Sequence, residues 1–172
     1  LEKPGTGRPL DGRIAVITGS TSGIGLGIAR ALADAGATIV LNGLGDAKEI
    51  DLLCTSLAAE AGTTVGYNGA NLLDPDQSAG LISQTIAQFG RCDIVVNNAG
   101  IQHVSPIEDF PAAKYDAIIA LNLSSAFHTI RTAFGPMKQA GWGRIVNIAS
   151  AHGLVASPFK SAYVAAKHGI IG

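Results

Sequence analysis

Three polar residues near the C-terminal end of the chain have types and spacing suited to proton transfer. Ser150 lies thirteen residues before Tyr163, and Lys167 follows the tyrosine by four. Residues four apart share one face of a helix, so the side chains of Tyr163 and Lys167 are expected to lie together. A free phenol, with a pKa near 10, is a poor base at neutral pH, but a neighbouring positive charge favours the phenolate. The pattern predicts general acid–base chemistry on a hydroxyl or carbonyl group.

A second candidate site is the glycine-rich stretch TGSTSGIGLG at 18–27, which lies between an apolar run and a helix-like segment. Glycines such as Gly19, Gly23 and Gly25 allow a tight turn and a close approach to a pyrophosphate, whose charge then lies at the helix N-terminus. The spacing is TGxxxGxG, which differs from the GxGxxG pattern of the commonest dinucleotide-binding fold. On their own, these glycines indicate a nucleotide site only weakly.

Five apolar, β-branched runs are predicted to be the strands that position these groups. They cover residues 13–18, 37–42, 63–68, 92–98 and 143–150. Nearly continuous apolar strands are typical of a parallel sheet that is covered on both faces. Because helix-like segments alternate with these strands, the sequence predicts βαβ units with right-handed crossovers. The expected fold class is α/β, with a doubly wound, Rossmann-like parallel sheet.

The helices between the strands are predicted from apolar spacing and from signals at their ends. Segment 23–36 has apolar residues at helical spacing and ends on a glycine. In segment 74–90, Asp74 is expected to cap the N-terminus and Pro75 to occupy the first helical position, and the segment again ends on glycine. The apolar spacing in 117–134 predicts a packed helix.

The composition excludes several classes of protein. Of the 172 residues, 47% are hydrophobic and 15% are charged, which is typical of a globular chain. The net charge of −1 lacks the basic excess of a nucleic-acid-binding surface. No apolar run reaches the roughly 18 residues of a membrane-spanning helix, so neither nucleic acid nor membrane is an expected partner. A cytoplasmic location is predicted. Residues 1–9 lack the apolar middle of a signal peptide and are expected to form a flexible leader before one domain at 10–172.

The cysteines and most of the histidines show no metal-ligand spacing. Cys54 and Cys92 are far apart and form no CxxC pattern, so two buried, reduced thiols are expected. His103, His128 and His168 likewise have no partners at ligand spacing, so packing or surface roles are expected and no metal site is predicted.

Five motifs together identify the chain as a member of the short-chain dehydrogenases/reductases, because they occur in that family's order and at its spacings. The motifs are TGSTSGIG (18–25), NNAG (97–100), Asn122, Ser150 and YVAAK (163–167). Two longer stretches are more similar to the bacterial 3-hydroxybutyrate dehydrogenases of this family. These are NNAGIQHVSPIEDFP (97–111) and NIASAHGLVASPFKSAYVAAKHG (147–169). The resemblance implies hydride transfer between an alcohol and a nicotinamide cofactor.

The resemblance also implies a role for each catalytic residue. Tyr163 is expected to exchange a proton with the substrate, and Lys167 to favour the phenolate and hold the nicotinamide ribose. Ser150 is expected to form a hydrogen bond with the substrate oxygen. Asn122 matches the family's helix asparagine, which supports a proton relay through the lysine.

The cofactor is expected to be NAD. The implied binding residues are Gly19, Ser20, Thr21, Ser22, Gly23, Ile24, Gly25, Asn42, Leu44, Asn71, Leu72, Asn98, Ala99, Gly100, Tyr163 and Lys167. Asn71 stands where the family usually has an aspartate that contacts the adenine. The segment LNGLGDAK at 41–48 offers no arginine for a 2′-phosphate, which favours NAD over NADP. The acidic residue that usually binds the ribose hydroxyls of NAD is missing too. Lys48 is the one residue of this segment able to reach a phosphate.

The expected substrate is a small hydroxy acid or keto acid. Gln102, His152 and Lys160 match the positions with which 3-hydroxybutyrate dehydrogenases hold the substrate carboxylate, next to Ser150 and Tyr163. Such contacts would be charge-assisted hydrogen bonds that orient the reacting carbon. Apolar neighbours would leave little room for a long acyl chain; these are Leu154, Val155 and Phe159. The predicted reaction interconverts (R)-3-hydroxybutyrate and acetoacetate.

Two other functions remain open from the sequence. One is an NADP-dependent reductase of the same family that acts on 3-oxoacyl or sugar substrates, and the other is an inactive nucleotide-binding module. Family members continue beyond the position of Gly172 with further strands and a substrate-covering loop, so the chain is expected to be part of a longer one. By analogy with the family, segment 117–134 and the helix of Tyr163 are expected to form the interface of a dimer or tetramer.

Overall fold

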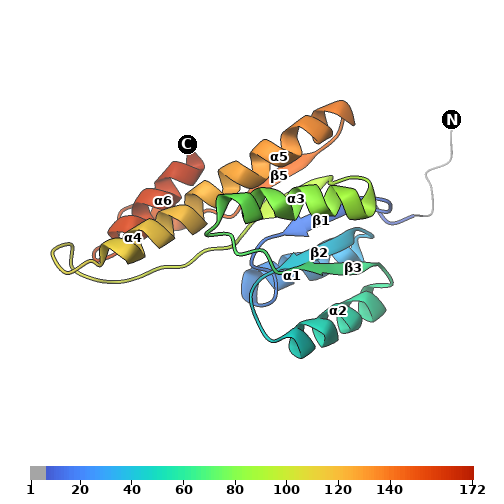
Figure 1. Ribbon diagram of the computed structural model, residues 1–172, viewed down its shortest axis with the longest axis horizontal. Helices are drawn as coiled ribbons and strands as arrows, with labels where there is room; N and C mark the ends of the chain where they lie inside the picture. The colour runs from blue at the N-terminus through green and yellow to red at the C-terminus, as the bar shows by residue number, and fades with distance from the viewer. Residues whose placement is uncertain (1–6) are drawn as a thin grey trace.

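The computed structural model describes residues 7–172, and their strands form a single parallel sheet with helices on both faces (Figure 1). The strands are β1 (Ile14–Ile17), β2 (Thr38–Asn42), β3 (Val65–Asn68), β4 (Ile94–Asn97) and β5 (Arg144–Asn147). Their order across the sheet is β3-β2-β1-β4-β5, and every neighbouring pair is parallel. Each strand lies inside one of the predicted apolar runs, so the predicted doubly wound α/β fold is confirmed.

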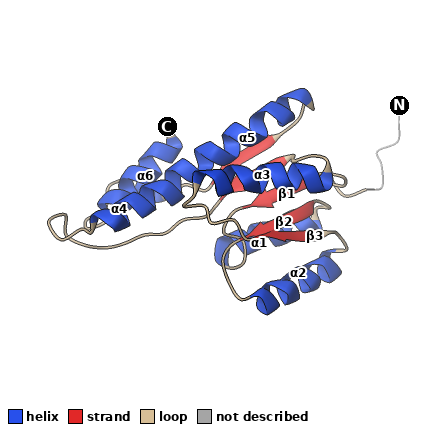
Figure 2. Ribbon diagram, in the orientation of Figure 1, coloured by secondary structure: helices blue, strands red, loops and turns tan. Residues whose placement is uncertain are grey.

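The helices alternate with the strands along the chain, as Figure 2 shows. They are α1 (Gly23–Asp34), α2 (Ala47–Ala61), α3 (Pro75–Phe89), α4 (Ala112–Ile119), α5 (Ser125–Gln139) and α6 (Ser161–Ile171). The predicted ends of α3 are confirmed: the Asp74 carboxylate accepts hydrogen bonds from the amides of Asp76 and Gln77, and Gly90 has a φ of 78°. The predicted helix at 117–134 extends from α4 to α5 and includes a π-helical turn, η1 (Ala120–Ser124), that the apolar spacing did not predict.

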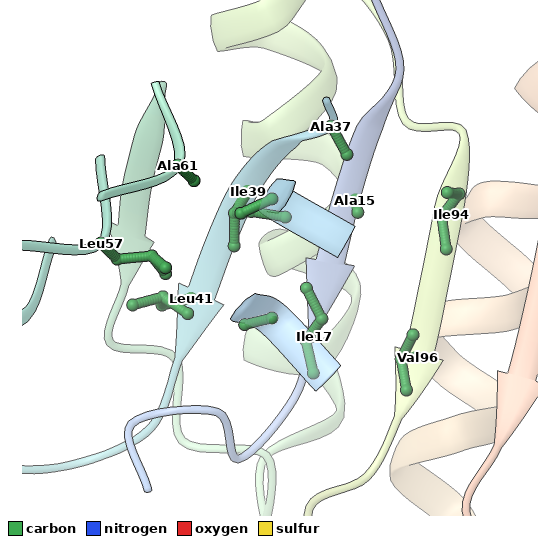
Figure 3. Packing of buried hydrophobic residues seen from close by; sticks show 11 residues of the cluster. Ala15, Ile17, Ala37, Ile39, Leu41, Leu57, Ala61, Ile94 and Val96 are labelled. Carbon is green, nitrogen blue, oxygen red and sulfur yellow. The ribbon is translucent and has the colours of Figure 1, made fainter. Parts of the chain in front are cut away.

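Alternate residues of the central strands pack against opposite helical layers. In β1, Ala15 and Ile17 belong to the cluster that includes residues of α1 and α2, which Figure 3 shows from close by. Ile14 and Val16 point to the other face and pack in the cluster that includes residues of α3 and α5. All four side chains are at most 7% exposed, because both faces of the sheet are covered there.

The last helix, α6, rests on α4 and η1 through a third cluster. Its Ala162 and Ala166 pack with Ile118 of α4, and Tyr163 packs partly against the same cluster. A short 3₁₀ turn, η2 (Ala151–Gly153), follows β5 and contacts α6. In Figure 1, α4 and α6 lie together at the left of the view. This packing places Tyr163 and Lys167 close to the carboxyl end of β5.

The expectations about the leader and the cysteines have mixed outcomes. Residues 1–6 of the predicted leader lie outside the described residues, whereas Arg8 donates hydrogen bonds to the carbonyls of Ala61 at 2.5 Å and Gly62 at 3.2 Å. Cys92 is buried as predicted, but Cys54 is only half-buried, because it lies at the margin of the cluster under α2. Between residues 7 and 172, the helices are too short or too polar to cross a membrane.

Candidate active site

A cavity of about 660 Å³ lies at the carboxyl ends of β1, β2 and β4. The chain order reverses at β1, and such a switch point is where doubly wound sheets bind their ligands. The predicted cofactor-binding residues that line this cavity are Gly19, Thr21, Ser22, Ile24, Gly25, Asn42, Leu44, Asn71, Leu72, Asn98, Ala99 and Gly100. Five further residues line it that were not predicted: Gly43, Ala70, Leu73, Ile101 and Leu121.

The glycine-rich loop approaches the neighbouring chain too closely for larger residues. Gly19 has a φ of 60°, and a Cβ atom there would lie 2.9 Å from the Cα of Ala99. A Cβ on Gly25 would overlap the carbonyl oxygen of Gly19. These close approaches explain why the sequence has glycine at both positions.

The N-terminus of α1 is suited to bind an anion. Its N-cap residue, Ser22, makes no side-chain hydrogen bond to the first turn within the described part of the chain, and that turn holds no acidic residue. The first amides of a helix have no intrahelical acceptor, and the helix dipole is positive at this end. Since Ser22 and Gly25 line the cavity, these groups fit the pyrophosphate of a dinucleotide.

Three of the predicted cofactor residues, Ser20, Gly23 and Asn42, differ in their position relative to the cavity. Ser20 is fully buried and does not line the cavity: its Oγ donates to the carbonyl of Ile17 at 2.7 Å and accepts from the amide of Asn42 at 3.0 Å. Gly23 is also not a lining residue among those described. Asn42 does line the cavity, but its Nδ2 donates to the carbonyls of Asn68 and Ala70, both at 3.0 Å. Ser20 and Asn42 therefore shape the ends of β1, β2 and β3.

Thr18 was not predicted as a site residue, although it joins the glycine-rich loop to the NNAG stretch. Its buried Oγ1 accepts hydrogen bonds from the amides of Asn98 and Ala99, both at 2.9 Å. The Asn98 side chain returns two hydrogen bonds, to the carbonyls of Thr18 at 2.9 Å and Gly19 at 3.0 Å. The position of Thr18, directly before the first glycine of the motif, is the sequence signal that could have identified it as a site residue. These contacts hold together two walls of the cavity.

Asn122 lies in the π-helical turn η1 and is buried. Its Oδ1 accepts a hydrogen bond from the amide of Ile101, and its Nδ2 donates to the carbonyl of Ile101, both at 2.8 Å. A π-helical turn inside an α-helix is frequent at functional sites. The structure therefore places Asn122 in contact with the loop after β4 that borders the cavity.

The predicted catalytic tyrosine has two close neighbours. The ammonium of Lys167 lies 5.7 Å from the centre of the Tyr163 ring, and the ring of His152 meets that of Tyr163 edge-on at 6.3 Å between centres. Lys167 is only 5% exposed and donates a hydrogen bond to the carbonyl of Ile148 at 2.7 Å. Burial lowers the pKa of Lys167 below its ordinary value. Tyr163 and Lys167 do not line the cavity in the described structure, but they lie beside the adjacent strand β5.

The predicted substrate-binding residues come from three segments. Ser150 ends the stretch after β5, and its Oγ accepts a hydrogen bond from the amide of His152 at 3.1 Å. The Nδ1 atom of His152 is buried and has no hydrogen-bond partner within residues 7–172. Lys160 directly precedes α6, and Gln102 is exposed in the loop between β4 and α4. A free donor or acceptor on His152 beside Tyr163 is suited to bind a polar ligand.

The comparisons with known proteins agree with this geometry. Residues 13–172 match the family model described as short chain dehydrogenase. The chain is 61% identical over 160 residues to a D-beta-hydroxybutyrate dehydrogenase of Rhizobium meliloti and 58% identical over 164 residues to one of Cupriavidus necator. These matches cover 93% and 95% of the chain, and the chain spans 62% of the length of either relative.

Solved structures show the same architecture. A metagenomic short-chain oxidoreductase in complex with NADP superposes with a TM-score of 0.89 at 34% identity, covering 95% of this chain and 74% of that one. Proteins of this family bind NAD(P). The fold, the glycine-rich loop and the family match lead to one conclusion. The chain belongs to the short-chain dehydrogenase/reductase family.

Proposed function

We propose that the chain is an NAD-dependent oxidoreductase that interconverts (R)-3-hydroxybutyrate and acetoacetate. The observation that carries this proposal is the contact of Tyr163 with both Lys167 and His152 beside β5. Lys167 supplies a positive charge to the phenol, and His152 supplies an unsatisfied ring nitrogen for a substrate. The similarity to two D-beta-hydroxybutyrate dehydrogenases supports the same substrate.

In the oxidation, Tyr163 acts as the general base and takes the proton of the substrate hydroxyl. NAD, held by the residues that line the cavity around the glycine-rich loop, would supply the hydride acceptor for the carbon that carries this hydroxyl. The cation of Lys167 stabilises the phenolate form of Tyr163, and the hydroxyl of Ser150 donates a hydrogen bond to the substrate oxygen. In the reverse direction, the Tyr163 hydroxyl returns its proton to the carbonyl oxygen, and Ser150 keeps the same contact.

The substrate carboxylate is held by Lys160, Gln102 and His152. A lysine cation and an amide donor form charge-assisted hydrogen bonds with a carboxylate. A buried nitrogen without a partner costs stability, and a bound ligand removes that cost for His152 Nδ1. Fixing the carboxylate end positions the hydroxyl carbon of a short acid next to Tyr163.

NAD is favoured over NADP by the charge of the cavity. Among the residues described, the side chains that line it are all uncharged, including Leu44 at the end of β2. A 2′-phosphate brings about two negative charges and needs a cationic partner at this position. Lys48 lies in the first turn of α2 next to Glu49, beyond the lining residues. A cofactor with a free 2′-hydroxyl is therefore the better match.

The substrate assignment is tested by comparing Lys160→Ala with Lys160→Arg in the full chain. The alanine variant should raise KM for 3-hydroxybutyrate about tenfold or more, because the lost charge-assisted contact is worth that much. The change should be much smaller for an uncharged secondary alcohol of similar size, and Lys160→Arg should retain most of the affinity. Equal effects on both substrates would contradict the proposal, as would better activity on a coenzyme A thioester than on the free acid.

We further propose that two copies of the chain associate through α5. Phe127 and Phe134 lie seven residues apart on one face of this helix and are 60% and 58% exposed. Large apolar side chains that share an exposed face are typical of a protein interface. Sedimentation of Phe134→Asp should show a smaller species than that of the unmodified chain, and an unchanged species would contradict the assignment.

A further inference from the structure

Phe159 has a backbone conformation that is unusual for its residue type. Its φ is 61°, and it is the one non-glycine residue with positive φ between residues 7 and 172. This left-handed region is strained for a bulky side chain. The ring is 57% exposed, so burial of the ring does not explain why the strain is kept.

The conformation is held by a hydrogen bond between two loops. The carbonyl of Phe159 accepts from the amide of Ser105 at 2.9 Å. Ser105 lies three residues after Gln102 in the loop between β4 and α4. Phe110, at the end of the same loop, packs against the cluster that includes the first turn of α6. The loop of Gln102 is therefore joined to the chain that enters α6.

The same residue sets the direction of Lys160. Phe159 directly precedes Lys160, whose carbonyl accepts the first hydrogen bond of α6 from the amide of Val164 at 2.9 Å. A change of φ at Phe159 would rotate the chain before the helix and displace the Lys160 Cα–Cβ bond. It would also move the carbonyl away from Ser105.

We propose that Phe159 is a positioning residue whose left-handed backbone, held by the Ser105 amide, orients Lys160 and Gln102 toward one substrate carboxylate. This inference rests on the proposed function, because that function gives the two side chains a common ligand. For affinity toward the short acid, the essential feature is the backbone conformation of Phe159; its ring, which is expected to limit the room for longer acyl chains, is not required for this affinity.

Three substitutions separate the backbone from the ring. Phe159→Gly and Phe159→Asn remove the ring and still allow positive φ, whereas Phe159→Val removes the ring and disfavours it. In the full chain, the glycine and asparagine variants should keep KM for 3-hydroxybutyrate within about threefold of the original value. The valine variant should raise it about tenfold or more, with kcat and the KM for NAD nearly unchanged. For an uncharged secondary alcohol, all three should behave alike. If the glycine variant loses affinity as much as the valine variant, the ring is required and the inference is wrong.

A measurement without substrate distinguishes this inference from the proposed function. Hydrogen exchange of the Ser105 amide, followed by NMR, should be slow in the original chain and in Phe159→Gly, and about tenfold faster or more in Phe159→Val. Ser105→Ala, which keeps the amide, serves as the control, and Ser105→Pro removes the donor and should reproduce the KM change of Phe159→Val. Unchanged exchange in Phe159→Val overturns the inference. If the exchange rates follow the expectation and the original chain does not oxidise 3-hydroxybutyrate, the proposed function fails while the joining of the two loops stands.

Discussion

The carboxamide of Asn122 pairs with both backbone polar groups of Ile101, donating to its carbonyl and accepting from its amide at 2.8 Å. This contact joins the π-helical turn of the long helix to the loop that borders the cavity. A Cβ on Gly100 would lie 3.3 Å from Oδ1 of Asn122, so the loop approaches the helix closely there. Asn122 thus fixes the end of the NNAG loop to the π-helical turn.

Asn122→Leu should destabilise the fold and weaken cofactor binding. Leucine has a similar size but removes the side-chain partners of the Ile101 amide and carbonyl, and an unsatisfied polar group that is shielded from water costs about 1–3 kcal/mol. Urea unfolding measures the loss of stability, and calorimetry measures NAD affinity. Asn122→Asp keeps the acceptor and loses the donor, so its stability should be intermediate. If the Asn122→Leu variant is as stable as the original chain, the two hydrogen bonds between Asn122 and Ile101 contribute nothing to stability.

Tyr163→Phe should abolish most of the turnover without unfolding the chain. The ring still packs against the cluster of α4 and α6, and only the hydroxyl that exchanges the proton is lost. Turnover should fall about 100-fold or more, the usual scale for a general acid–base group. NAD titration and circular dichroism serve as controls, since both should remain unchanged. Normal turnover in this variant would remove Tyr163 from the mechanism.

Asp93 is expected to make stability depend on pH in the acid range. Its carboxylate is 2% exposed and accepts hydrogen bonds from Arg91, Arg13 and the amide of Ile14. Burial acts to raise the pKa of Asp93, but the hydrogen bonds and the Arg91 charge outweigh it, so the pKa is lowered. Because the pKa of Asp93 is lower in the folded chain than in the unfolded chain, its ionised form stabilises the fold. This stabilisation is complete above the unfolded-state pKa of about 3.9, and it is lost as the pH falls through the folded-state pKa.

Asp93→Asn should therefore be less stable than the original chain at neutral pH and should lose less stability on acidification. Urea unfolding at a series of pH values from 7 down to about 3 measures both effects. Asp93 lies just before β4, at the amino ends of the strands and opposite the cavity, so activity at neutral pH should change little. If the free energies of unfolding of the two proteins fall by equal amounts as the pH is lowered, another group controls the acid transition.

Features that depend on nearby residues were predictable from the sequence. The Asp74 cap, the glycine after α3 and the apolar strands each follow from a few consecutive residues. The motifs also predicted most of the residues that line the cavity, since the sheet brings strand ends together at one edge. Whether these residues bind NAD stays a prediction.

Features that depend on distant contacts were not predictable. Ser20 belongs to the glycine motif, but its side chain points inward because the β2 backbone offers it partners. The pairing of Asn122 with Ile101 joins residues 21 apart and gives no local signal. The positive φ of Phe159 occurs together with a hydrogen bond from an amide 54 residues away, and no intrinsic preference of phenylalanine indicates it.

The cofactor preference should change when a positive charge is added at the end of β2. Leu44 lines the cavity and is 69% exposed, so arginine at this position buries no charge and should be tolerated. The backbone beside it is held by the Tyr67 hydroxyl, which donates to the carbonyl of Gly43 at 2.6 Å. The expected position of an added guanidinium is therefore next to the adenosine ribose, where it would pair with a 2′-phosphate.

In the original chain, kcat/KM should be about tenfold or more higher with NAD than with NADP. Leu44→Arg should raise the efficiency with NADP about tenfold or more and leave that with NAD nearly unchanged, because only NADP carries the phosphate. Leu44→Gln adds polarity without charge and serves as the control, so it should not improve NADP. The gain from arginine should shrink as salt is added, since this exposed charge pair is screened. Comparable efficiency with both cofactors in the original chain would contradict the NAD assignment, and an equal gain from glutamine would contradict its electrostatic explanation.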